Sequence, residues 1–340
     1  MYGSTTPDPC PPSAAPEASL TVLGAPTLSQ TDLLRELEPV VEENLERHLK
    51  VAKDWMPHEY VPWSEGRDFA LLGGEAWESS QSKMSEVART SLVVNLLTED
   101  NLPSYHHEIA TVFGRDGAWG TWVHRWTAEE GRHGIAIRDY LLASRSVDPE
   151  ALERARMTHM TAGFESANHD DLLRSLAYVS FQELATRISH RNTGKITKDP
   201  VADQLLARIA ADENLHMLFY RNLLGAALQV APNQTMRAVT EVVKTFEMPG
   251  SSIEDFTRKS VQIALSGIYD LRIHHDDVLA PVLRQWGVYD IEGLDAEGEA
   301  ARDELDAFLA ELNTAADRFE DKRNNHHQKL RSRGVEPEVV

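Results

Sequence analysis

Apolar residues recur at three- and four-residue intervals along most of the chain, the spacing that places them on one face of an α-helix. The pattern begins near Ser29 or Thr31, either of which can cap a first helix, and Pro39 is expected to kink or split that helix. From Met84 onward the same spacing continues, and runs that alternate strictly between apolar and polar residues are scarce. The sequence therefore predicts an all-α protein.

Clusters of glycine and proline divide this helical pattern into segments. Residues 55–78 are rich in Trp, Pro and Gly and are expected to form an irregular connection. Further breaks are expected at Pro103 and at residues 114–120, 192–200, 232–233 and 249–250. We expect a disordered N-terminal tail over residues 1–28, a single helical domain over 29–318 and a charged C-terminal tail over 319–340.

Composition and charge exclude several classes of protein. The formal net charge of −20 repels nucleic acid and anionic membranes, so neither is an expected partner. The single cysteine, Cys10, excludes a disulfide framework and a thiolate metal cluster. No apolar run approaches the roughly 18–20 residues needed to span a bilayer, and the first residues do not resemble a secretory signal. We therefore expect a cytoplasmic protein without a membrane span.

One pattern of acidic and histidine residues occurs twice. Glu99 is followed by Glu130 and His133, and a second copy consists of Glu183, Glu213 and His216, with Glu-to-Glu intervals of 31 and 30 residues. Within each Glu-x-x-His, positions i and i+3 share one helix face, so both side chains can reach one metal ion. The arrangement matches the ligand set of di-iron helix bundles, four glutamates and two histidines on four helices.

The surroundings of these residues favour a buried metal site over a solvated surface. Glu99 and Glu183 lie among apolar helical neighbours, where a carboxylate is costly to bury unless it is paired or bound to metal. The alternative is that these residues form solvated faces with surface ion pairs. Oxygen and imidazole ligands without sulfur suit iron or manganese, and iron if the chemistry uses dioxygen.

Four local sequences closely resemble the soluble acyl-acyl-carrier-protein (acyl-ACP) desaturase family, in particular its bacterial branch. They are TEDNLPSYH (98–106), RWTAEEGRHG (125–134), SFQELATRISHRNTG (180–194) and AADENLH (210–216), in the family's order and spacing. The resemblance implies a ferritin-like four-helix di-iron bundle, elaborated to about eleven helices, in a homodimer with two iron ions per subunit. Glu130 and Glu213 would bridge the irons, Glu99 and His133 would complete one, and Glu183 and His216 the other.

The same resemblance implies an activity and its partners. The substrate would be a saturated acyl chain carried on acyl carrier protein, from which two hydrogens are removed in an oxygen-dependent reaction. Electrons would come from an external reduced ferredoxin or a similar carrier. Other di-iron oxygenases, such as hydroxylases and N-oxygenases, and a non-catalytic iron-binding ferritin-like protein remain alternatives.

Several residues are expected to support the centre. Thr186, one turn beyond Glu183, is expected to face bound oxygen, or else to bond the carbonyl one turn back. The resemblance implies that Asp212 and Trp55 surround His133. Trp126 lies one turn before Glu130 on the same helix face, where it is expected either to support the centre or simply to pack in the core.

A basic run that follows Glu183 in the sequence is a candidate docking surface for the carrier. It consists of Arg187, Arg191, Lys195 and Lys198, and solvated side chains without a partner are the alternative. His190 lies in the same stretch and is interpreted as a structural residue. A ribonucleotide reductase subunit is disfavoured because Ile137 stands where a radical tyrosine would be expected.

Overall fold

The computed structural model describes residues 27–164 and 170–340, and nearly all of the expected N-terminal tail lies outside these ranges. Their main helices are α1 (Gln30–Val51), α2 (Glu86–Asp100), α3 (Leu102–Phe113), α4 (Gly117–Ala143), α5 (Pro149–Ala162), α6 (Leu172–Thr197), α7 (Pro200–Val230), α8 (Pro232–Thr245), α9 (Phe256–Leu265), α10 (Leu271–Ile273), α11 (Ala280–Trp286) and α12 (Ala296–Ser332). The π-helical turn η5 (His274–Leu279) joins α10 to α11, so the described ranges contain eleven continuous helices. They contain no β-strand, which confirms the all-α prediction.

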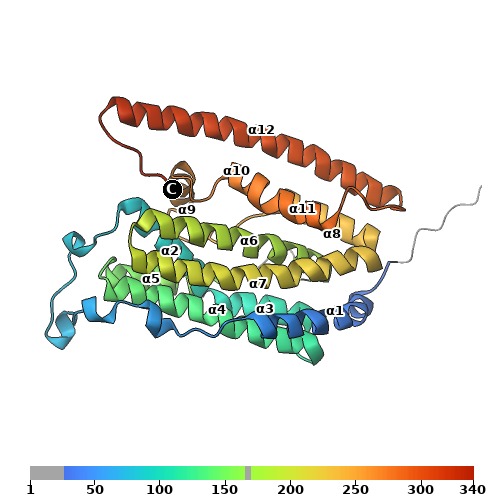
Figure 1. Cartoon of the computed structure of the whole chain (residues 1–340), viewed down its shortest axis with the longest axis horizontal. Coiled ribbons are helices and arrows are strands. Elements are labelled where there is room, and N and C mark those ends of the chain that lie inside the picture. Colours follow the sequence, from blue (N-terminus) through green and yellow to red (C-terminus); the bar gives the residue numbers. More distant parts are fainter. Residues whose placement is uncertain (1–26, 165–169) are drawn as a thin grey trace, which may run out of the picture.

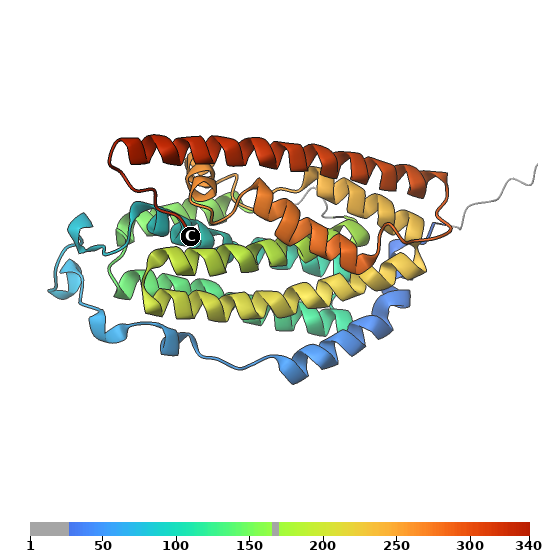
Figure 2. The ribbon, with the colours of Figure 1, turned by 45° about the horizontal axis from the view of Figure 1, so that its top comes forward.

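Four long helices form the central bundle. Helices α2, α4, α6 and α7 contact one another around its axis, and α1 and α3 pack against the outside (Figure 1). On the opposite side from α1, helix α12 lies across α8 and α10 as an outer layer (Figure 2). None of the described helices has both the length and the apolar character needed to cross a membrane. The four helices that carry the duplicated motif are therefore covered on one side by α1 and on the opposite side by the layer that contains α12.

Local sequence explains where these helices begin. Ser29 and Ser85 accept hydrogen bonds from backbone N–H groups in the first turns of α1 and α2. Asp199 caps α7 in the same way and is followed by Pro200, whose missing N–H is harmless at the first helical position. Serine and aspartate before a helical pattern thus mark the helix starts here.

Helix α1 is continuous through Pro39, so the proline does not split it, and the neighbouring Leu37 and Val41 are fully buried against the bundle. Helix α12 continues past residue 319 into the charged C-terminal segment, where Arg323 forms an ion pair with Asp270. His327 also hydrogen-bonds to the Leu265 carbonyl at 2.9 Å.

The apolar core has two parts, separated by the duplicated motif. Along α4, one buried apolar cluster ends at Trp126 and the other begins at Ala136. Along α7, the cluster that contains Ala136 ends at Ile209, and the cluster that contains Trp126 begins at Met217. The Glu-x-x-His motifs fall between these limits on both helices. The bundle therefore holds a polar layer in its interior, between two conventional hydrophobic cores.

Candidate metal centre

The six residues of the duplicated motif meet in this polar layer. Each is at most 8% exposed, and they come from α2, α4, α6 and α7. Their potential ligand atoms fall into two groups in which all atoms lie within 4.8 Å of one another: Glu99, Glu130, His133 and Glu213, and Glu130, Glu183, Glu213 and His216. Glu130 and Glu213 belong to both groups. The fold thus brings together two adjacent four-residue sites that share two carboxylates.

The inward-facing atoms suit cations better than they suit one another. Five of them are buried without a hydrogen-bond partner in the described structure: Glu130 Oε1, His133 Nδ1, Glu183 Oε2, Glu213 Oε1 and His216 Nδ1. Buried polar groups are normally paired, and a buried carboxylate is tolerated when it coordinates a metal. Ligands that share one ion at about 2 Å lie within about 4 Å of each other, close to the observed grouping. The residues present therefore fit a pair of metal ions.

The protonation of the carboxylates supports the same conclusion. Burial, together with repulsion from Glu213 and Glu130, raises the pKa of Glu183 well above its usual range. Burial also acts on Glu213, but the nearby imidazoles of His133, at 3.3 Å, and His216, at 3.8 Å, overcome it and lower its pKa. The raised pKa of Glu183 means that this buried site disfavours its negative charge, and bound cations would reverse that effect.

The outer nitrogen of His133 faces a second layer of polar groups. Its Nε2 lies 3.5 Å from Asp212 Oδ2, which also accepts hydrogen bonds from Trp55 Nε1 at 2.7 Å and Arg132 at 3.2 Å. Arg208 binds the other Asp212 oxygen. The Trp55 ring is nearly parallel to the imidazole, with a centroid distance of 6.3 Å. The structure thus places Asp212 and Trp55 around His133, as the sequence predicts.

The surroundings of His216 include two residues that sequence reasoning missed. Its Nε2 lies 3.0 Å from Oε2 of Glu129, and His48 Nε2 lies 2.9 Å from the same oxygen. Glu129 is adjacent to a predicted ligand, which could have drawn notice, whereas His48 comes from α1 and carries no spacing signal. His190 also does more than fill the core, since its Nε2 lies 2.8 Å from Glu99 Oε1.

Two other predicted residues contact the centre from the side of a cavity. Trp126 Nε1 donates a hydrogen bond of 3.0 Å to Glu183 Oε1. The Thr186 hydroxyl accepts a 2.9 Å hydrogen bond from Gln182, and among the described residues it forms no hydrogen bond to the carbonyl one turn back. Both Trp126 and Thr186 line the cavity, and a role for Thr186 beside bound oxygen stays a prediction.

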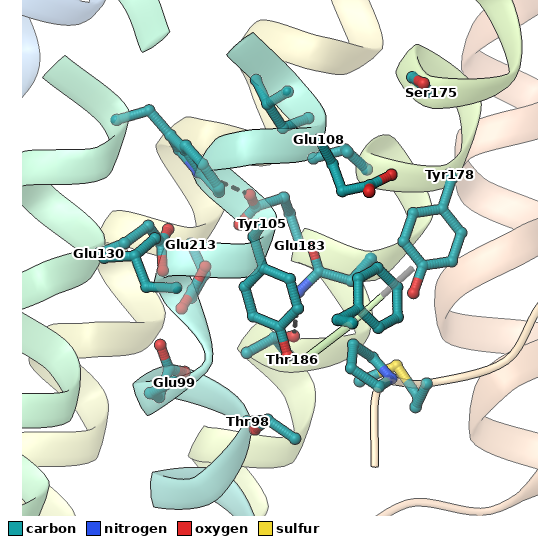
Figure 3. A pocket seen from close by; sticks show the side chains of 18 residues that line it. Thr98, Glu99, Tyr105, Glu108, Glu130, Ser175, Tyr178, Glu183, Thr186 and Glu213 are labelled. Atoms are coloured by element: carbon teal, nitrogen blue, oxygen red, sulfur yellow. Dashed lines mark hydrogen bonds between the residues drawn. The ribbon is translucent and has the colours of Figure 1, made fainter. Parts of the chain in front are cut away.

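A cavity adjoins the cluster between α2, α3 and α6. Its lining includes all four carboxylates of the motif but neither histidine. Its apolar walls are formed by Leu102, Tyr105, Ile109, Trp126, Phe164, Tyr178, Val179, Met248 and Pro249. In Figure 3, Glu99, Glu130 and Glu213 lie at one end, and Glu108, Ser175 and Tyr178 lie at the other. The four carboxylates thus border a largely apolar pocket.

The predicted basic docking run lies away from this lining. Arg191 forms an ion pair of 3.0 Å with Asp203, and Lys195 donates to Asn192 at 3.4 Å. Lys195 and Lys198 are exposed, whereas Arg187 is half-buried. None of these four cations lines the cavity of the described structure. A role for them in docking stays a prediction.

Known proteins match most of the chain. The sequence model of the fatty acid desaturase family matches residues 29–335, a range that includes the whole cluster. The candidate acyl-ACP desaturase DesA1 of Mycobacterium tuberculosis is 54% identical over 300 residues, covering 86% of this chain and 89% of DesA1. The chloroplastic stearoyl-ACP 9-desaturase of Gossypium hirsutum is 30% identical over 309 residues, covering 86% and 77%. The X-ray structure of M. tuberculosis DesA2 aligns with a TM-score of 0.64 at 32% identity, covering 75% of this chain and 95% of DesA2.

Proposed function

The chain belongs to the fatty acid desaturase family, and we propose that it introduces a double bond into a saturated acyl chain carried on acyl carrier protein. The proposed metal ligands are Glu99, Glu130, His133, Glu183, Glu213 and His216, which would hold two iron ions. One saturated –CH2–CH2– unit, one dioxygen, two electrons and two protons would give –CH=CH– and two water molecules. When bound, the di-iron pair supplies the oxidising power for this reaction.

The observation that carries this proposal is the orientation of the cluster toward the cavity. All four carboxylates border the cavity, and the two histidines approach from the other side. The carboxylate side of the cluster is therefore the side that dioxygen and a substrate would reach. A storage protein would need no such largely apolar pocket beside its metal ligands.

The chain's own residues would orient the substrate and exclude water. Leu102, Ile109 and Val179 give the cavity apolar walls against which methylene groups can pack. Those contacts hold the chain beside the carboxylates and keep bulk water away from the reacting carbons. The Thr186 hydroxyl, held by Gln182, is the proton-bearing group that we place next to the reacting oxygen.

The partners follow from the same proposal. The acyl group would be presented by acyl carrier protein, and we assign the exposed Lys195 and Lys198 to its docking together with Arg187 and Arg191. A reduced ferredoxin or similar protein would supply the electrons. We further propose a homodimer acting in the cytoplasm, which size-exclusion chromatography with light scattering and cell fractionation would test.

A turnover assay tests the proposed function directly. Iron-loaded protein is mixed with reduced ferredoxin, dioxygen and a series of saturated acyl-ACP substrates, and the products are measured by mass spectrometry. Loss of two hydrogens, abolished in Glu130→Ala and His216→Ala, would support the desaturase. Gain of an oxygen atom would instead indicate a hydroxylase at the same site. Iron uptake with no change in any acyl chain would contradict the proposal and favour iron storage.

A further inference from the structure

The outer nitrogens of the two motif histidines are bound in matching ways. Oε2 of Glu129 lies within hydrogen-bond distance of two histidine nitrogens, His216 Nε2 at 3.0 Å and His48 Nε2 at 2.9 Å. The other Glu129 oxygen accepts a 2.6 Å hydrogen bond from Arg125 Nε and forms an ion pair of 2.5 Å with a terminal nitrogen of the same side chain. All of these groups except Arg125 are at most 3% exposed. This is a buried network that the proposed reaction does not use.

The network repeats the plan seen at His133. There, Oδ2 of Asp212 lies beside His133 Nε2 and accepts a hydrogen bond from Trp55 Nε1, and Oδ1 binds Arg208. At the second site Glu129 replaces Asp212, and His48 replaces Trp55. Each outer ring also stacks on its histidine, with angles of 14° at Trp55 and 25° at His48. The two halves of the centre therefore have equivalent outer supports built from different residues.

One short segment of the chain supplies both outer rings. His48 lies at the end of α1, and Trp55 follows seven residues later in the turn that leads to η1 (Pro57–Tyr60). Helix α1 and η1 each pack against both α4 and α7, which carry the two histidines. Arg132 lies between the two supports, 3.2 Å from Asp212 and 3.8 Å from Glu129. The end of α1 therefore covers the histidine side of the whole cluster.

Hydrogen-bond chemistry then decides which nitrogen of His216 is available. An ionised carboxylate only accepts hydrogen bonds, so each histidine that contacts Glu129 must present Nε2–H. With Nε2 directed at Glu129, Nδ1 is the nitrogen of His216 that is left to bind a metal ion. That Nδ1 faces the carboxylate cluster, 2.7 Å from Glu130 Oε1. Contacts to a carboxylate of this kind fix the orientation of metal-binding histidines and increase their basicity.

We propose that Glu129 and His48 are positioning residues for His216, which they hold in the orientation that directs Nδ1 at one of the two metal ions. Glu129 acts by accepting the Nε2–H group, and His48 acts by fixing the Glu129 carboxylate. His48, Glu129 and His216 could also be viewed as a third metal group, but their spacings of 2.9 and 3.0 Å are those of hydrogen bonds. This inference rests on the proposed di-iron function.

Metal binding and spectroscopy test the inference without relying on activity. Parent protein, Glu129→Ala and Asp212→Ala are loaded with iron, and the affinity and Mössbauer spectrum of each iron are measured. We expect Glu129→Ala to weaken one of the two irons by about 10–100-fold and to change only its spectrum. Asp212→Ala should affect the other iron. A purely structural role would lower the melting temperature and leave both iron spectra unchanged, which would overturn the proposal.

Conservative variants keep the test decisive if an alanine variant fails to fold. Glu129→Gln retains an acceptor oxygen and should recover part of the lost affinity. His48→Gln retains an N–H donor and should bind iron more tightly than His48→Phe, which retains the shape without the donor. Equal affinities and spectra in these two His48 variants and in the parent would contradict the role of His48. A parent protein that binds no pair of irons would contradict the proposed function instead.

Discussion

The indole Nε1 of Trp126 donates a hydrogen bond of 3.0 Å to Oε1 of Glu183, and both side chains are buried. Trp126 also lines the cavity, so one side chain contacts both a proposed metal ligand and the proposed substrate site. In Trp126→Phe the ring packing is largely kept, and the hydrogen bond is lost. Leaving a buried acceptor without its donor should cost about 1–3 kcal/mol in urea unfolding of the metal-free protein. Iron affinity should also fall, because Glu183 loses its orientation.

Trp119 offers a matched control for this variant. It is 2% exposed, and its Nε1 donates a 3.0 Å hydrogen bond to the Leu34 carbonyl, away from the centre. Trp119→Phe removes the same kind of bond, so its free energy of unfolding should fall by a similar amount. Its iron affinity should match that of the parent protein. Equal iron affinities in the Trp126 and Trp119 variants would refute a role for Trp126 at the centre.

Thr186 allows the chemistry to be separated from metal binding. Its hydroxyl faces the cavity and accepts a hydrogen bond from Gln182, but it belongs to neither group of ligand atoms. Thr186→Val has nearly the same shape and lacks the hydroxyl, so iron content should be unchanged. If the hydroxyl handles a proton during oxygen use, product formation should fall by about 100-fold or more. Thr186→Ser should keep most of the activity, and a Thr186→Val enzyme with full yield per dioxygen consumed would exclude the role.

The convergence of the six motif residues was predictable because it depends on local spacing. Glu-x-x-His places two side chains on one helix face, and its repetition at 31 and 30 residues identifies two helix pairs. Contacts between distant segments have no such signature. His48 and Glu129 are 81 positions apart in the sequence, and the residues of α1 show no periodic metal-binding pattern. Those contacts depend on how α1 packs against α4 and α7.

Tertiary packing also explains the errors in element boundaries. Proline removes one backbone hydrogen bond and favours a kink, which is why a break at Pro39 is a reasonable expectation. In the folded chain, burial of Leu37 and Val41 outweighs that local preference. The charged residues of α12 similarly suggest a tail, yet Arg323 is paired with the buried Asp270. Long-range partners of this kind cannot be read from composition.

His274 should make stability depend on pH. It is buried in η5, where burial and the nearby His275 lower its pKa to about 4 from an ordinary value of 6.5. The folded state therefore holds this proton less tightly than the unfolded chain. Its contribution to stability is fully present above pH 6.5 and is lost as the pH falls toward 4. The loss should amount to about 3 kcal/mol by linkage.

Urea unfolding at about pH 7 and about pH 4.5 measures this effect. His274 Nδ1 lies 2.8 Å from the Tyr269 hydroxyl, and its ring stacks on Phe246 with a centroid distance of 4.8 Å. His274→Gln removes the titrating group, so the stability of this variant should fall less between the two pH values than that of the parent. Parallel pH profiles for parent and variant would show that another group accounts for the acid sensitivity.

Val179 should control the length of acyl chain that the cavity accepts. It is 6% exposed and lines the cavity on α6, one turn before Glu183, so its side chain can be changed without altering a proposed ligand. Val179→Phe should exclude the end of long chains, and each methylene that no longer fits should lower kcat/KM by about 10–200-fold. Val179→Ala should shift the preference toward longer chains. Competition assays with mixed acyl-ACP substrates measure both changes, with iron content as the control. If both variants keep the parent's chain-length preference, the acyl chain does not pass Val179, and the cavity is not the site where it binds.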